Sequence, residues 1–198
     1  MRRKSANKRD TLVEAADKLV YVQGFHETTL ADIAVQAGIP LGNLYYYFKT
    51  KEELGAAIVA RRAKYYSDLA AEWDEQADPK ARIVAFIEYV EGRRKHLSRS
   101  GCPIGSLCQE LHKGDGGFLA EQAAALFTEQ LKWLEAQFLA LGCEDASADH
   151  ALHLVSAMQG AALLTHTFGD PGLIQREAAR VKAWIKVLQP SRRPLTEF

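Results

Sequence analysis

The sequence lacks the long apolar segments that would place it in a membrane. No run of about 18 or more apolar residues occurs among its 198 residues, so a transmembrane helix is not expected. The N-terminal stretch MRRKSANKRD also lacks the apolar core of a secretory signal. The sequence therefore predicts a cytoplasmic protein.

Cysteine is scarce as well. The chain contains three, Cys102, Cys108 and Cys143. An odd number of cysteines in a chain of this size does not suit the disulfide framework of a secreted protein. We expect these thiols to be reduced.

Motifs of common enzyme chemistry are missing too. The sequence has no glycine-rich phosphate loop, nucleophile elbow or metal motif. His150 and His153 suit one helix face, but apart from Asp149 no further metal ligand occurs at matching spacing. We therefore interpret these two histidines and His166 as surface or pocket residues. We expect no metal, no cofactor and no enzymatic activity. Cys102 paired with a nearby histidine as a nucleophile stays open as an alternative.

Net charge is zero for the whole chain, but the charges are unevenly distributed. Residues 1–67 contain 11 Lys and Arg against 7 Asp and Glu, and the rest of the chain carries the opposite excess. The sequence thus predicts a basic N-terminal part on an acidic body. Part of the basic excess precedes or opens the first helix, at Arg2, Arg3, Lys4, Lys8 and Arg9. This segment is either a solvated tail or an arm that contacts DNA.

Strand patterns are absent, and helical spacing of apolar residues predicts an all-α fold. The first helix should end at Gly24, and the second should run from an N-cap at Thr29 to Gly38. Seven further helices are expected at about 40–48, 51–75, 79–97, a short segment after SGCPIGS, 117–141, 147–168 and 171–188.

Short signals mark the ends of the early helices. Thr29 with Asp32 suits the start of the second helix, and Pro40 suits the first turn of the third. Thr50 with Glu53 forms a capping-box pattern that opens the fourth.

Two short helices separated by a glycine-containing turn indicate a helix-turn-helix. Leu44 and Phe48, four residues apart, should face inward. Tyr45, Tyr46 and Tyr47 then project from the other sides of the helix, where at least two meet solvent or a partner. Tyrosine hydroxyls beside lysines suit a DNA backbone, whereas the alternative reading places the rings in the core.

The segment TTLADIAVQAGIPLGNLYYYFKTKEEL, residues 28–54, resembles the DNA-binding signature of the TetR family of bacterial transcriptional regulators. The resemblance implies a homodimeric, all-helical repressor with a three-helix DNA-binding domain at 1–50. It also implies a ligand-binding and dimerisation domain at 51–198, with the helix at 51–75 linking the two. The expected function is a regulator that binds a palindromic operator and is released by a small-molecule inducer.

The resemblance also implies DNA-contacting residues. Thr28 and Thr29 would touch phosphate at the start of the second helix, and Lys51 would do so from the fourth. The major-groove set would be Gly42, Asn43, Tyr45, Tyr46 and Tyr47.

Two positions depart from the family pattern. Leu41 stands where relatives often have a polar or basic residue, and Pro40 where Ser or Thr is common. Asn43 is therefore the best candidate for amide readout of a base, and Leu41 for contact with a thymine methyl group.

Aromatic and polar side chains in the body are candidates for an inducer pocket, although such stripes also suit a core. The candidate residues are Phe86, Tyr89, Cys102, Phe127, Trp133 and His166. Cys102 should be the N-cap of a helix that begins at Pro103, where backbone N–H groups favour a thiolate, so a response to electrophiles is one hypothesis.

The last two predicted helices should meet their symmetry mates in a four-helix dimer interface. Small residues at Ala157, Gly160, Ala161 and Ala162 and an apolar face at Val181, Trp184, Ile185 and Leu188 suit that role. The main alternative to a regulator is a helical adaptor that binds protein through the tyrosine cluster.

Overall fold

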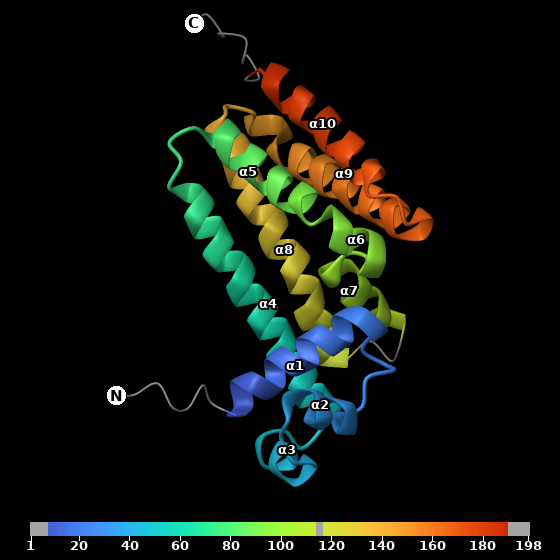
Figure 1. The fold of residues 1–198 in the computed structure, drawn as a ribbon. Coiled ribbons are helices and arrows are strands. Elements are labelled where there is room, and N and C mark those ends of the chain that lie inside the picture. The colour runs from blue at the N-terminus through green and yellow to red at the C-terminus, as the bar shows by residue number, and fades with distance from the viewer. Residues whose placement is uncertain (1–7, 114–116, 190–198) are drawn as a thin grey trace, which may run out of the picture. The chain divides into compact units, whose positions relative to one another are not determined.

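The computed structural model describes residues 8–113 and 117–189, and all regular structure within them is helical (Figure 1). The helices are α1 (Lys8–Gln23), α2 (Leu30–Ala37), α3 (Leu41–Tyr47), α4 (Lys51–Asp74), α5 (Pro79–Gly92), α6 (Arg94–Ser100), α7 (Pro103–Lys113), α8 (Gly117–Ala140), α9 (Ser147–Phe168) and α10 (Gly172–Val187), with a 3₁₀-helix, η1 (Glu144–Ala146), before α9. The predicted all-α class is confirmed. None of the described helices is both long enough and apolar enough to span a membrane.

The described residues form two compact units. The head unit combines residues up to 67 with residues 103–127, and the body unit combines 68–102 with those from 128 onward. The chain passes between units within α4, between Cys102 and Pro103, and within α8. The predicted domain boundary at residue 50 stays a prediction, and Arg2, Arg3 and Lys4 of the proposed arm lie outside the described residues.

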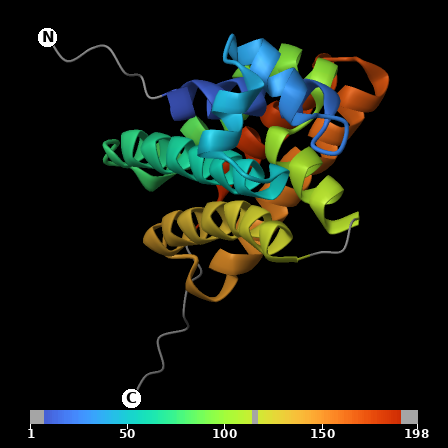
Figure 2. The ribbon, with the colours of Figure 1, turned by 90° about the horizontal axis from the view of Figure 1, so that it is seen from below.

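The head unit is built on α1, α2 and α3, which pack against one another and can be followed from below in Figure 2. The three helices pack through apolar side chains. Burial of these side chains removes hydrocarbon from water, which stabilises the unit. The fully or nearly fully buried residues include Leu12, Ala16, Ile33, Leu44 and Phe48.

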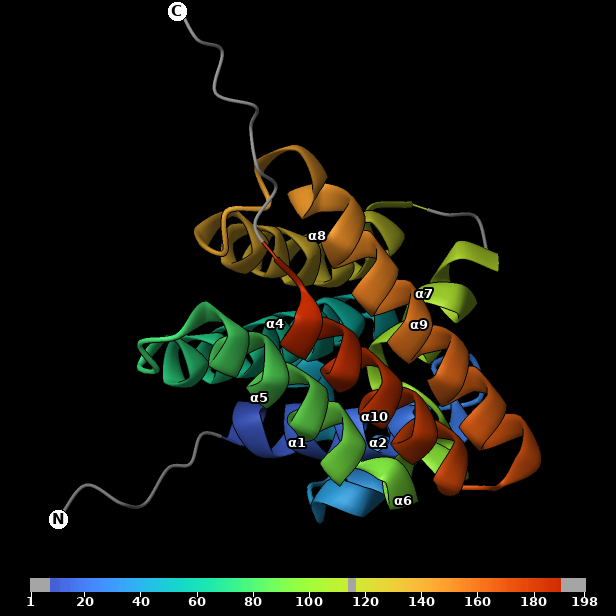
Figure 3. The ribbon, with the colours of Figure 1, turned by 90° about the horizontal axis from the view of Figure 1, so that it is seen from above.

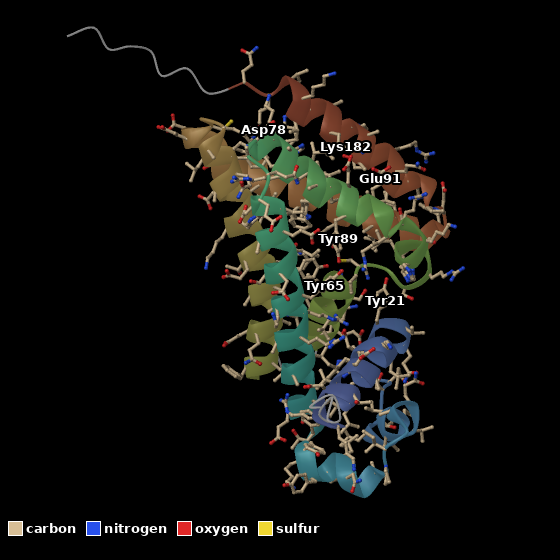
Figure 4. The ribbon with its side chains drawn as sticks, turned by 60° about the vertical axis from the view of Figure 1, so that its left-hand side comes forward. Tyr21, Tyr65, Asp78, Tyr89, Glu91 and Lys182 are labelled. Carbon is tan, nitrogen blue, oxygen red and sulfur yellow. The ribbon has the colours of Figure 1, made fainter. Side chains whose placement is uncertain are left out.

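In the body unit α9 and α10 run side by side, and α5 lies along α10 (Figure 3). Lys182 of α10 donates a 2.9 Å hydrogen bond to Oε2 of Glu91 on α5, and both side chains are labelled in Figure 4. That hydrogen bond, together with the charges of Glu91 and Glu88, raises the pKa of Lys182. The ion pairs therefore link α5 to α10.

The predicted fifth helix was too long. It was expected to continue to about Leu97, but α5 ends at Gly92 and α6 begins at Arg94. Arg93 lies between them with φ −89° and ψ 7°, which breaks the helical path. The change lets α6 pack on α9 and bury Leu97.

Candidate nucleic-acid interface

The start of α2 is fixed by a complete capping box. Thr29 Oγ1 accepts a 3.1 Å hydrogen bond from Asp32 N, and Asp32 Oδ2 accepts from Thr29 N at 3.0 Å. The Thr29 hydroxyl also donates to Asp32 Oδ2 at 2.6 Å. The side-chain hydrogen bond from Thr29, then the backbone one, lowers the pKa of Asp32. The predicted cap is confirmed.

Thr28 is fully buried, and its hydroxyl donates a 2.6 Å hydrogen bond to Gly24 O. Its side chain therefore holds the turn between α1 and α2 and does not reach the surface, so we do not keep it among the expected phosphate contacts. Thr29 is exposed, but its hydroxyl is engaged by Asp32. In the part of the chain that the structure describes, the N–H groups of Leu30 and Ala31 have no acceptor, as is usual in a first helical turn.

The turn between α2 and α3 follows the predicted pattern. Gly38 has φ 64°, a left-handed conformation that glycine adopts without steric cost. Its N–H and that of Ile39 donate to Val35 O and Ala34 O, each at 3.0 Å, which satisfies the last carbonyls of α2. Pro40 is the N-cap of α3 and not part of its first turn, so the helix begins one residue later than expected, because the ψ of Pro40, 138°, is extended.

The third helix presents two different faces. Leu44 and Phe48 are 0% and 2% exposed and anchor it to the head core. Tyr46 is 77% and Tyr45 45% exposed, whereas Tyr47 is half-buried. The rings of Tyr46 and Tyr47 meet edge to face, with centroids 5.1 Å apart. As predicted, Leu44 and Phe48 face inward and at least two of the three tyrosines meet solvent.

The first turn of α3 is also open. Leu41, Gly42 and Asn43 are exposed. A Cβ added to Gly42 would meet nothing within 4 Å, and its φ is not positive. The fold of the free chain therefore gives no reason for glycine at this position.

The two lysines after α3 are engaged within the chain. Lys49 Nζ donates a 2.7 Å hydrogen bond to Tyr45 O, at the end of α3. Lys51 Nζ donates to His26 O at 2.8 Å and lies 4.9 Å from the centroid of the Phe25 ring. Each ammonium keeps further donors, so a phosphate contact would add to these bonds.

Sequence reasoning missed two features of this surface. Val35 on α2 is 82% exposed, although the apolar face of α2 is buried through Ile33 and Ala34. The guanidinium of Arg9 lies 5.0 Å from the centroid of the Phe48 ring. Helical spacing could have found the outward Val35, since it lies about 100° from Ala34.

Three of the six inducer-pocket candidates come together in the body unit. Phe86, Tyr89 and Trp133 surround Trp73, with ring centroids 5.9, 5.7 and 5.3 Å from it. Trp133 Nε1 donates to Asp74 Oδ1 at 3.2 Å. Figure 4 labels Tyr89, which also stacks with Arg93 at 5.6 Å. Trp73 is the member that sequence reasoning missed.

The other three candidates do not join this cluster in the described contacts. Phe127 belongs to the head unit, and His166 is exposed on α9. Cys102 directly precedes α7, as predicted, and its sulfur accepts a 3.4 Å hydrogen bond from Gln159 Nε2. Cys143 is buried, and burial raises the pKa of its thiol.

His150 and His153 both lie against Trp184, with ring centroids 5.3 and 5.0 Å from it. Within residues 8–113 and 117–189, no group of three or more His, Cys, Asp or Glu side chains is placed to hold a metal ion.

Comparison with known proteins places the same region in a family. Residues 12–58 match the model of the bacterial regulatory proteins of the tetR family. Transcriptional regulator AcuR of Cereibacter sphaeroides is 29% identical over 143 residues, which cover 71% of this chain and 65% of AcuR. The chain thus spans slightly less than two thirds of that relative.

A second relative covers more of the chain. The HTH-type transcriptional regulator LmrA of Bacillus subtilis is 29% identical over 163 residues, or 80% of this chain and 86% of LmrA. Among solved structures, a TetR transcriptional regulator from Legionella pneumophila superposes with a TM-score of 0.83 at 18% identity, covering 91% of this chain and 98% of that one. The structural likeness shows a shared fold.

Proposed function

Because the chain belongs to the TetR family of bacterial transcriptional regulators and carries its DNA-binding helix-turn-helix, we propose that it is a ligand-responsive repressor. In this proposal it binds a palindromic operator as a homodimer in the cytoplasm, and a small-molecule inducer releases it. It has no enzymatic activity of its own.

One observation carries the proposal, namely the exposed tyrosine face of α3. Two large aromatic side chains, Tyr45 and Tyr46, are left in solvent on a helix whose opposite side is firmly anchored by Leu44 and Phe48. The two side chains are neighbours on one helix, and a contiguous exposed apolar patch is a feature of binding surfaces. Tyrosine hydroxyls reach phosphate oxygens, and the rings pack on sugars and thymine methyl groups.

The neighbouring groups fit a duplex. Asn43 can pair with an adenine edge, Leu41 can contact a thymine methyl, and Gly42 lets the helix approach closely. Free N–H groups of Leu30 and Ala31 at the positive end of α2 suit a phosphate, with Thr29 beside them. Lys51 adds a cation at the start of α4, so the surface can bind backbone and base edges together.

Dimerisation is proposed through α9 and α10. Ala161, Ala162, Val181 and Ile185, which were expected to face a partner, are already buried within the single chain. The face left open on α9 is apolar, with Leu152, Leu163, Leu164 and Phe168 between 47% and 70% exposed. Gly160 lies among them with nothing within 4 Å of an added Cβ, which suits close approach of a second helix.

The inducer is proposed to bind in the body unit, near the aromatic cluster of Phe86, Tyr89 and Trp133. Ligand binding would favour a dimer shape in which the recognition helices no longer match successive major grooves, about 34 Å apart. A coupling of about 1–3 kcal/mol would lower operator affinity roughly 5- to 150-fold. A response of Cys102 to electrophiles would act through the same equilibrium.

Selection of bound duplexes from a random DNA pool tests the proposal. The expected result is a palindrome bound by one dimer with strongly salt-dependent affinity, because Lys and Arg contacts to phosphate release counterions. If reduced, folded and dimeric protein enriches no sequence, the tyrosine surface has another partner and the regulator reading is overturned. The selected duplex then serves as the probe in an inducer screen.

A further inference from the structure

The turn between α1 and α2, residues 24–29, sets where the helix-turn-helix begins. Gly24 has φ 93°, and the buried Thr28 hydroxyl closes the turn on Gly24 O. Thr29 directly follows as the N-cap of α2. A displacement of this turn therefore moves the start of α2. The connection from α2 to α3 is short, and its N–H groups at Gly38 and Ile39 are hydrogen-bonded to α2.

His26, in the middle of this turn, is held from two other helices. Its N–H donates a 3.2 Å hydrogen bond to Glu110 Oε2, and its ring Nε2 lies 3.1 Å from Glu110 O. A carbonyl oxygen can only accept, so the ring nitrogen is the donor. Its own carbonyl accepts from Lys51 Nζ at 2.8 Å. The backbone N–H, the backbone carbonyl and ring Nε2 of His26 are thus bound by α7 and α4.

Glu110 also packs directly on the turn. A Cβ at Gly24 would lie 2.9 Å from Glu110 Oε2, closer than real Cβ atoms come, and 3.0 Å from Oε1, which is a tight contact. The positive φ of Gly24 strains any other residue at this position, and an added Cβ would also have to push the Glu110 carboxylate aside. The Glu110 carboxylate therefore contacts the turn at Gly24 and is hydrogen-bonded to it at His26.

The other end of α7 is anchored to the head unit as well. Arg62 of α4 is 6% exposed, and its Nε donates to Asp17 Oδ1 of α1 at 2.8 Å. Its Nη1 donates to the carbonyl of Pro103, the first residue of α7. Separating this buried guanidinium from its two partners is costly, because the polar groups would lose their hydrogen bonds where little water can replace them.

We propose that Glu110 is a positioning residue for DNA binding. From α7, outside the three-helix motif, it fixes the α1–α2 turn through His26 and Gly24 and so sets the helix-turn-helix in its binding position. The inference rests on the proposed function, because the consequence it names is operator affinity. It makes α7 an element whose movement changes the DNA-binding surface.

The test uses the full chain and the duplex selected above. Glu110→Ala removes the acceptor of the His26 N–H, and Glu110→Gln keeps an oxygen there. Gln109→Ala, at the exposed neighbouring position on the same helix, is the matched control. His26→Ala removes the imidazole ring of an exposed residue, with its contact to Glu110, and leaves the backbone bonds of His26. It replaces Glu110→Ala in the test if that variant does not fold.

Glu110→Ala should weaken operator binding about tenfold, the cost of one hydrogen bond to a charged group. Glu110→Gln and Gln109→Ala should stay within about twofold of wild type, and His26→Ala should lose about threefold. The salt dependence of binding should be unchanged in all four, since none of these residues touches phosphate. Amide hydrogen exchange across residues 24–37 should accelerate in Glu110→Ala without DNA.

Wild-type affinity and exchange in Glu110→Ala would overturn the positioning role while leaving the proposed function intact. Equal losses in Glu110→Ala and Glu110→Gln would also overturn it, because the amide oxygen should restore the bond. A wild-type chain that binds no duplex overturns the proposed function, and in that case hydrogen exchange alone reports whether Glu110 holds the turn.

Discussion

Lys49 Nζ donates a 2.7 Å hydrogen bond to the carbonyl oxygen of Tyr45. The bond joins Lys49, the second residue after α3, to one of the last carbonyls of that helix, which has only seven residues. Helices this short gain little from their own hydrogen bonds, so a cation on the C-terminal carbonyls stabilises α3. Lys49 thus contributes to the shape of the tyrosine surface, in addition to its positive charge.

Tyr46→Phe removes one hydroxyl from the most exposed ring of that surface. We expect operator binding to weaken about 3- to 10-fold, the effect of one lost hydrogen bond, with an unchanged melting temperature. Fluorescence anisotropy with the selected duplex measures operator affinity, and thermal unfolding measures the melting temperature. Tyr65→Phe, an exposed tyrosine on α4, is the control and should bind as wild type. Unchanged binding in Tyr46→Phe would remove Tyr46 from the interface.

Lys51→Ala should weaken operator binding and also flatten its dependence on salt by about one unit, because one phosphate contact is lost. The slope matters here because Lys51 also holds His26 O. Loss of that internal bond alone would lower affinity and leave the slope unchanged. Titration of binding against salt for wild type and Lys51→Ala therefore separates the two roles, and an unchanged slope would rule out the phosphate contact.

The head unit was largely predictable because its signals are local. Thr29 with Asp32, Gly38, and the four-residue spacing of Leu44 and Phe48 each act within one or two turns of chain, where sequence spacing and spatial distance nearly coincide. Local spacing could not show that Thr28 is buried while its neighbour Thr29 is exposed. Adjacent residues differ in burial when a turn points one inward, and that depends on the position of Gly24.

Long-range contacts were not predictable from the sequence. Glu110 and His26 are 84 residues apart, and nothing in either neighbourhood indicates the pairing. In the body, Phe86, Tyr89 and Trp133 follow helical stripes that suit core and pocket equally. Their convergence on Trp73 depends on how α4, α5 and α8 pack. The break at Arg93 was missed because the contact of α6 with α9 overrides local helix propensity.

Gly42→Ala tests why glycine occupies an open position. Alanine should stabilise the free protein by up to about 1 kcal/mol, since Gly is a poor helix residue, and should weaken operator binding if DNA lies close to this backbone. Gly92→Ala, also with nothing within 4 Å of its added Cβ, is a matched control expected to keep full binding. Equal operator affinity for both variants would show that close approach at Gly42 is not used.

Asp32→Ala should lower the melting temperature at neutral pH, because it removes half of the capping box of α2. The pKa of Asp32 is lowered in the folded chain, so its contribution is present above the unfolded value of about 4 and is lost as pH falls through the folded value. The difference in melting temperature between wild type and Asp32→Ala should therefore shrink below about pH 4. Melting curves at pH 7, 5 and 3.5 measure it, and a constant difference would contradict this assignment.

Leu163→Asp tests the proposed dimer face. Leu163 is 57% exposed in the single chain, so a charge there costs the monomer little. In a dimer built on α9 and α10 the same carboxylate would be buried beside Leu164 and its symmetry mate without a partner, which is strongly unfavourable. We expect sedimentation equilibrium to show a monomer with a nearly normal melting curve at low concentration. Val22→Asp on α1, at a site 73% exposed and outside this face, should remain a dimer.

The loss of operator affinity in the Leu163→Asp monomer should be far larger than the loss in any single contact variant, because one molecule no longer links two half-sites. A Leu163→Asp dimer with wild-type dissociation would place the interface elsewhere.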